Sequence, residues 1–203
     1  MATPVFQKGL QMFIEAEEHG GSNGDAISSV ADLSVHGRDS VCASNQPTVK
    51  TGAVNGKRSF NFDGTNNPLR YDGEFTIRCG FMVVKVHGNF NGTYEGILSS
   101  PTNFGISAGI GGSNLLYDFQ YKYYEYRLND GIYSPALDSA GNRSFVAPAP
   151  TSGFGIIYFK FWTDLTVEGI QLGQDRDLPT INTTARSPCS RSTIAIFSRR
   201  TCG

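Results

Sequence analysis

Apolar residues recur at every second position along most of this chain. In a β-strand this spacing places successive side chains on opposite faces, so the pattern predicts strands. In the run Glu74–Val86 the apolar phase moves from odd to even positions beside Gly80, which predicts a bulge or bend there. Leu10–His19 fits either a strand or a helix, and we favour a strand because Gly20 and Gly21 follow directly. The other alternating runs are Ser59–Phe62, Leu115–Leu128, Phe154–Thr163, Leu165–Leu172 and Thr193–Phe197.

Turn signals separate these runs at short intervals, as expected of many short antiparallel strands. The chain is therefore predicted to be all-β, a sandwich or a barrel, with neither a repeat nor a second domain in residues 1–203. Leu137–Gly153 is too rich in proline for a central strand and is interpreted as a long surface loop. The turn signals are Asn55-Gly56, Asp63-Gly64, Asp72-Gly73, Asn91-Gly92, Asn129-Asp130-Gly131 and Ser139-Ala140-Gly141-Asn142.

Composition agrees with one domain that buries a sizeable core. The 203 residues are 39% hydrophobic and 17% charged, and 24 glycines with 9 prolines favour turns and strands over exposed helices. A net charge of −1 is too small for a nucleic-acid partner. We expect neither membrane insertion nor a secretion signal, because no apolar run is long enough and the first residues lack a basic region followed by an apolar one.

Four cysteines occur without a C-x-x-C pair, and reduced thiols are the default interpretation for a domain of this size. In an oxidising compartment three pairings are possible, and the spacing does not choose among them. The cysteines are Cys42, Cys79, Cys189 and Cys202.

Three sequence elements carry a resemblance to a known family: Gly9–Ala16, Val30–Asp39 and Asn55–Gly64. The chain resembles the concanavalin A-like lectin/glucanase superfamily, in the laminin G-like form of phage and bacterial proteins. The resemblance implies an antiparallel two-sheet jelly-roll sandwich, with carbohydrate binding or a structural role as its activity. The segment 178–203 is atypical, because only Ser192–Ser198 could serve as the closing strand.

Catalysis is not expected. Glycoside hydrolysis needs two carboxylates across one bond, and no E-x-D-x-E series is present. Glu15 and Glu17 come nearest and are interpreted as a solvated strand end. Gly105–Gly109 matches G-x-S-x-G but lacks the helix that must follow a nucleophile elbow. Three isolated histidines give no zinc pattern, so we expect no cofactor.

Aromatic residues make up 12% of the chain and are densest between Tyr117 and Tyr126. Tyrosines on an outward sheet face could stack against sugar rings, or could instead contact a neighbouring subunit or pack in the core. Asn66, Asn67 and Arg70, just past the Asp63-Gly64 turn, are weaker candidates for a polar rim. The candidate glycan-binding residues are Tyr121, Tyr124, Tyr126, Asn66 and Asn67.

Two further groups are weaker candidates. Asp175 and Asp177 could offer oxygen ligands to Ca²⁺, although a turn-stabilising role suits two local carboxylates better. The last 26 residues carry four arginines and no acid, whereas residues 1–177 hold 13 basic and 18 acidic residues, a net of −5. This asymmetry predicts docking on a second copy or an acidic partner, or simply a solvated strand end. The arginines are Arg186, Arg191, Arg199 and Arg200.

Two hypotheses follow from the sequence. The first is a non-catalytic, virion-associated protein that binds surface polysaccharide for attachment. The second is a purely structural virion component, such as a capsid decoration or tail protein, that contacts other virion proteins or copies of itself. In both, the protein assembles into a virion in the host cytoplasm.

Overall fold

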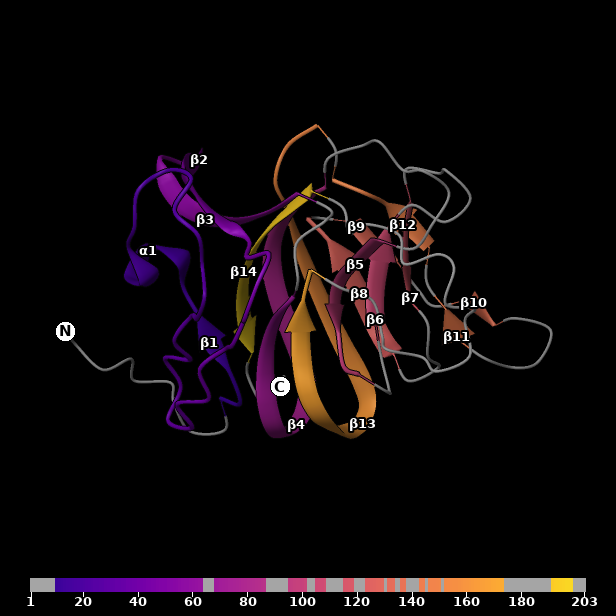
Figure 1. Ribbon diagram of the computed structural model, residues 1–203. Coiled ribbons are helices and arrows are strands. Elements are labelled where there is room, and N and C mark those ends of the chain that lie inside the picture. Colours follow the sequence, from indigo (N-terminus) through magenta and orange to yellow (C-terminus); the bar gives the residue numbers. More distant parts are fainter. Residues whose placement is uncertain are drawn as a thin grey trace, which may run out of the picture.

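The protein is built almost entirely from β-strands, with one four-residue helix among the described residues (Figure 1). The computed structural model describes residues 10–63, 68–86, 95–101, 105–108, 115–118, 123–129, 131–133, 136–137, 143–144, 146–150, 152–173 and 191–198. The elements are β1 (Phe13–Ile14), α1 (Ala16–His19), β2 (Thr48–Val54), β3 (Lys57–Asp63), β4 (Leu69–Val86), β5 (Glu95–Ser99), β6 (Gly105–Ala108), β7 (Leu115–Asp118), β8 (Tyr123–Leu128), β9 (Gly131–Tyr133), β10 (Ala136–Leu137), β11 (Arg143–Ser144), β12 (Val146–Pro148), β13 (Gly155–Leu172) and β14 (Arg191–Ser198).

The described strands form two antiparallel sheets, one of them curled. The main path of the large sheet runs β12-β7-β6-β5-β13-β4-β14-β3-β2, while β1 joins β14 and β8 with β9 joins β13. Among the described strands, β10 and β11 pair only with each other. The all-β prediction is confirmed, and the jelly-roll arrangement stays a prediction.

The two longest strands, β4 and β13, pair along their whole length and form a central ribbon (Figure 1). In β4 the buried positions change from odd numbers, such as Phe75 and Ile77, to even numbers, such as Met82 and Val84. The predicted change of phase beside Gly80 is therefore confirmed. As a result, the two halves of the ribbon turn opposite faces toward the core.

The irregularity itself lies on β13 and not at Gly80. Pairing continues unbroken from Gly155 opposite Val84 to Lys160 opposite Cys79, and the register then shifts before Leu165. Gly80 lies directly opposite Phe159, whose ring fills the space that a side chain at Gly80 would need. The glycine is required by this close approach of a buried ring, and the bulge predicted beside Gly80 follows directly, with its extra residues on β13.

Four local predictions are corrected. Asp72-Gly73 does not turn the chain but lies inside β4, where Gly73 adopts φ 102° next to a second register shift between Glu168 and Ile170. Asp72-Gly73 resembles a turn signal in the sequence because a glycine with positive φ occurs in both bulges and turns. Phe154–Thr163 and Leu165–Leu172 belong to one strand, β13.

The other two corrections concern segments with mixed signals. Leu10–His19 contains both a short strand, β1, and the helix α1. The predicted loop Leu137–Gly153 contains β11 and β12. Proline is tolerated in β12 because that strand lies at the edge of the sheet and pairs only with β7 among the described strands.

The core contains the apolar residues that the alternation assigns to it. Phe60, Phe62, Phe75 and Ile77 are all buried, as predicted. The hairpin signals at Asn55-Gly56 and after Leu128 are also confirmed, because Val54 pairs with Lys57 and Leu128 with Gly131.

The last described strand closes the sheet. β14 lies between β4 and β3, and its Phe197 pairs with Phe13 of β1, so the two ends of the described chain meet in one sheet (Figure 1). This confirms a closing strand at Ser192–Ser198.

The reduced state expected for the cysteines is wrong for Cys79, which is disulfide-bonded. Cys42 carries a buried thiol that donates to the carbonyl oxygen of Ser44 at 3.5 Å, and burial raises its pKa. Cys189 and Cys202 lie outside the described residues.

Candidate functional site

The most distinctive surface of the described chain lies on the outward side of β4, β13 and β8. Successive pairing places Arg127 of β8 opposite Tyr158 of β13, and Tyr158 opposite Phe81 of β4. Directly paired residues project to the same side of a sheet, so these three form one row across three strands. The next row on this side pairs Ile156 with Val83. We call Phe81, Val83, Arg127, Ile156 and Tyr158 the aromatic face.

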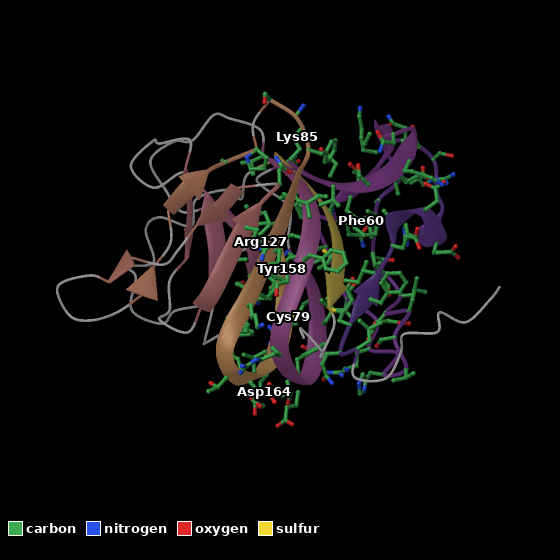
Figure 2. The ribbon with its side chains drawn as sticks, turned by 180° about the vertical axis from the view of Figure 1, so that it is seen from behind. Phe60, Cys79, Lys85, Arg127, Tyr158 and Asp164 are labelled. Carbon is green, nitrogen blue, oxygen red and sulfur yellow. The ribbon has the colours of Figure 1, made fainter. Side chains whose placement is uncertain are left out.

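The aromatic face is open to solvent although much of it is apolar. Ile156 is 52% exposed and Phe81 is 37% exposed, whereas Tyr158 is half-buried. The guanidinium of Arg127 lies over the Tyr158 ring, 5.9 Å from its centroid, within the range of a cation–π contact. Figure 2 shows Arg127 beside Tyr158, with Lys85 above them near the end of β4 and Asp164 below them, where the ribbon curls.

The face exists because the core changes sides at Gly80. Beyond Gly80 the even positions of β4 are buried, which leaves the odd positions Phe81, Val83 and Lys85 on the outside. On β13 the odd positions are buried in this half, so Ile156 and Tyr158 project outward. A large apolar side chain on the polar phase of a strand is the sequence signal for such a face.

Asn129, at the edge of this face, links the end of β8 to β13 by two hydrogen bonds. Its φ of 51° is in the left-handed region, and its side-chain oxygen accepts a hydrogen bond from the backbone N–H of Ile156 at 2.9 Å. The backbone N–H of Asn129 donates in turn to the carbonyl oxygen of Ile156 at 2.9 Å. This reciprocal pair fixes the end of β8 against β13, and with it the position of Arg127.

A second feature lies on the outward side of the other half of the ribbon. Here an open groove of about 390 Å³ is lined by Arg70, Asp72, Gly73, Glu74, Pro101, Glu168 and Gly169. Glu74 and Glu168 are directly paired on adjacent strands, and both are exposed. Arg70 forms an ion pair with Asp72 at 2.9 Å.

Two carboxylates on neighbouring strands are the kind of group that glycoside hydrolases use. The sequence could not reveal this pair, because its members come from strands far apart in the chain. Within the described residues no group of three or more histidines, cysteines or acids could hold a metal ion.

A third cluster is structural. The carboxylate of Asp32, which is 5% exposed, accepts hydrogen bonds from the backbone N–H groups of Phe13, Ser34 and Arg38 and from the Ser34 hydroxyl. Arg38 then donates to the carbonyl oxygens of Glu74 and Gln11. Its guanidinium lies 3.9 Å from the centroid of the Phe75 ring. The Asp32–Arg38 loop thereby holds the N-terminal segment against β4.

Tyr71 lies below this loop and is fully buried. Its hydroxyl makes no hydrogen bond of good geometry with the described residues, although the Ser40 side chain is close enough to affect its pKa. Burial is the largest cause of a strongly raised pKa at Tyr71, and the carboxylates of Asp32 and Asp39 act in the same direction while the Ser40 hydroxyl opposes them.

Most of the residues that the sequence singled out lie outside the described part of the chain, so their roles stay predictions. This holds for Tyr121, Asn66, Asn67, Asp175, Asp177, Arg186, Arg199 and Arg200. Tyr124 and Tyr126 are on β8, and Tyr126 is the register partner of Phe159. Arg191 begins β14 and pairs with Asp63.

Glu17, one of the two acids that come nearest to a catalytic pattern in the sequence, has a structural role. Glu17 belongs to α1 and forms an ion pair with Arg58 at 2.9 Å. Its pKa is lowered, chiefly because its carboxylate accepts a hydrogen bond from the backbone N–H of Arg58. The pair anchors the short helix on β3.

No helix in the described ranges has the length and apolar character to cross a membrane. Comparison of the chain with protein-family models, with curated proteins and with solved structures found no match.

Proposed function

We propose that this chain is a non-catalytic, virion-associated module that binds surface polysaccharide for attachment, and that the aromatic face is its binding surface. The observation that carries the proposal is the row formed by Arg127, Tyr158 and Phe81 on one exposed side of the sheet. The virion context comes from the sequence resemblance to sandwich domains of phage proteins.

The chemistry of the aromatic face suits a sugar ring. The C–H groups on one side of a sugar can stack on an aromatic ring, while its hydroxyls need hydrogen-bonding partners at the edge of the same site. Tyr158 supplies a half-buried ring, and Arg127 supplies donors beside it. Because both residues sit on paired strands, their spacing is set before a ligand arrives, which lowers the entropic cost of binding.

The direct test is a glycan array probed with the wild-type protein and with Tyr158→Ala. We expect the wild type to bind at least one class of glycan, Tyr158→Ala to lose that binding, and Tyr158→Phe to retain most of it because the ring is kept. Val41→Ala is the matched control, since Val41 is a 59% exposed apolar residue away from the aromatic face.

Near-UV and far-UV circular dichroism would establish that each variant is folded. A wild type that binds no glycan on the array, or a Tyr158→Ala variant that binds as well as the wild type, would refute the proposal. Release of reducing sugar from a bound glycan, lost in Glu74→Gln and Glu168→Gln, would replace it with a hydrolase whose carboxylates line the groove.

A structural virion component is the second candidate. It is favoured by the exposure of Ile156 and Phe81 in successive rows of the aromatic face, since exposed apolar clusters with Tyr and Arg are typical of protein interfaces. Light scattering over a range of protein concentrations would separate the two. Concentration-dependent assembly that Ile156→Lys abolishes, together with an empty glycan array, would support the structural role.

A further inference from the structure

The outward surfaces of the two halves of the ribbon differ in their charged residues. Around the aromatic face lie Lys85 on β4, Arg127 on β8 and Lys160 on β13. The groove of the other half holds three acids, Asp72, Glu74 and Glu168, with Arg70 paired to Asp72, and Arg78 follows on the same half of β4. The chain as a whole has a net charge of only −1, so the separation is a matter of placement and not of composition. Such a separation attracts a charged ligand to one half and repels it from the other.

The basic groups are spread along the strands. Lys160 is the register partner of Cys79, and Lys85 lies six residues further along β4. At about 3.3 Å per residue these positions are roughly 20 Å apart, which is long enough for several sugar units. Tyr158, the register partner of Phe81, lies between these two positions, and Arg127 lies beside it (Figure 2).

Arg127 is the best placed of the three cations. Its side chain is exposed, and its guanidinium lies over the Tyr158 ring, so a sugar stacked beside that ring brings its substituents to the guanidinium. Arginine binds a carboxylate through two parallel hydrogen bonds, which a neutral hydroxyl cannot match.

From these placements we infer that the glycan bound by the aromatic face is acidic, a polysaccharide whose repeating units carry carboxylates. This inference rests on the proposed function. The aromatic row contributes stacking with the sugar rings, and the cations on both sides of it contribute selection for the charged units.

The test compares acidic polysaccharides with neutral forms of the same sugars. Polygalacturonate, alginate and hyaluronan would each be measured by calorimetry against the methyl ester of the same chain, at low and at high salt. We expect at least one acid form to bind about tenfold or more tightly than its ester, because hydrogen bonds to charged groups are the stronger ones. That preference should shrink as salt rises.

Two variants separate charge selection from stacking. Arg127→Gln should lower the affinity for the acid form about tenfold and leave the affinity for the ester nearly unchanged. Tyr158→Ala should lower the affinity for both the acid and the ester. Lys50→Gln is the matched control, because Lys50 is an exposed lysine on β2, away from the aromatic face, and its loss should change neither affinity.

The outcomes distinguish the preference for acidic glycans from glycan binding itself. Equal affinity for acid and ester, binding of neutral glycans alone, or an equal effect of Arg127→Gln on both forms would overturn the acidic preference and leave glycan binding standing. Failure to bind any glycan would refute both.

Discussion

Replacing Gly80 by alanine tests whether the Phe159 ring packs directly against Gly80 in the central ribbon. A β-carbon added at Gly80 would lie 2.6 Å from Cζ of Phe159 and 3.0 Å from Cε1, closer than such atoms pack. Phe159 is itself 3% exposed and is held between its neighbours, so the ring cannot simply move into solvent. The backbone of Gly80 is not in the left-handed region, so the steric contact alone opposes the substitution.

The expected magnitude follows from two opposing effects. Replacing glycine by alanine at an unstrained position stabilises a protein by about 0.4–1 kcal/mol, because the unfolded chain loses freedom. Forcing an extra carbon into a packed core costs about 1–3 kcal/mol. We therefore expect Gly80→Ala to lower the free energy of unfolding by about 1–2 kcal/mol.

The assay is urea unfolding followed by circular dichroism, with Gly153→Ala as the control because nothing lies within 4 Å of a β-carbon built there. The single variant Phe159→Leu and the double variant Gly80→Ala/Phe159→Leu complete a double-mutant cycle. The smaller side chain opposite the alanine should restore part of the lost stability, with a coupling energy of about 0.5 kcal/mol or more between the two substitutions. A Gly80→Ala variant as stable as the wild type, or single losses that simply add, would show that the ring does not occupy this space.

Three further predictions follow from the described contacts. Tyr71→Phe should raise the free energy of unfolding by about 1 kcal/mol in thermal or urea unfolding, because it removes a buried hydroxyl that makes no hydrogen bond of good geometry with the described residues; a loss of stability would contradict this. Glu168→Gln should raise the free energy of unfolding by less than about 1 kcal/mol in thermal unfolding, since like charges on directly paired residues repel, and the gain should vanish in high salt. The pKa of His19, which packs edge-on against Phe60 at 5.8 Å, is lowered from 6.5 by burial. The unfolded chain therefore binds the proton more readily, and stability should fall as the pH drops below about 6.5, less steeply in His19→Gln than in the wild type.

The parts of the fold that the sequence could predict are those governed by neighbouring residues. Alternation predicts the strands, and the change of phase beside Gly80 correctly marks the point where the buried side of β4 changes. Asn55-Gly56 predicts its hairpin because positive φ at both residues suits a tight turn. The same reasoning fails at Asp72-Gly73, where the glycine with positive φ serves a bulge within a long strand.

The candidate site depends on pairing between distant strands, which local patterns do not determine. Arg127 meets Tyr158, and Glu74 meets Glu168, only because β13 pairs with β8 and β4 in one particular register. That register is set by packing of the whole core and not by the residues concerned. The exposed Phe81 and Ile156 did carry a signal, as large apolar residues on the outward phase, but its meaning depends on knowing which side of each strand is buried.

Mapping the contact surface by nuclear magnetic resonance tests the central claim most directly. Titration of the ¹³C-labelled protein with a glycan that it binds should shift the signals of Phe81, Ile156 and Tyr158 together, with Arg127 beside them, and leave those of Val35 and Val41 unchanged. Shifts confined to Glu74, Glu168 and the rest of the groove, with the aromatic signals unmoved, would contradict the account.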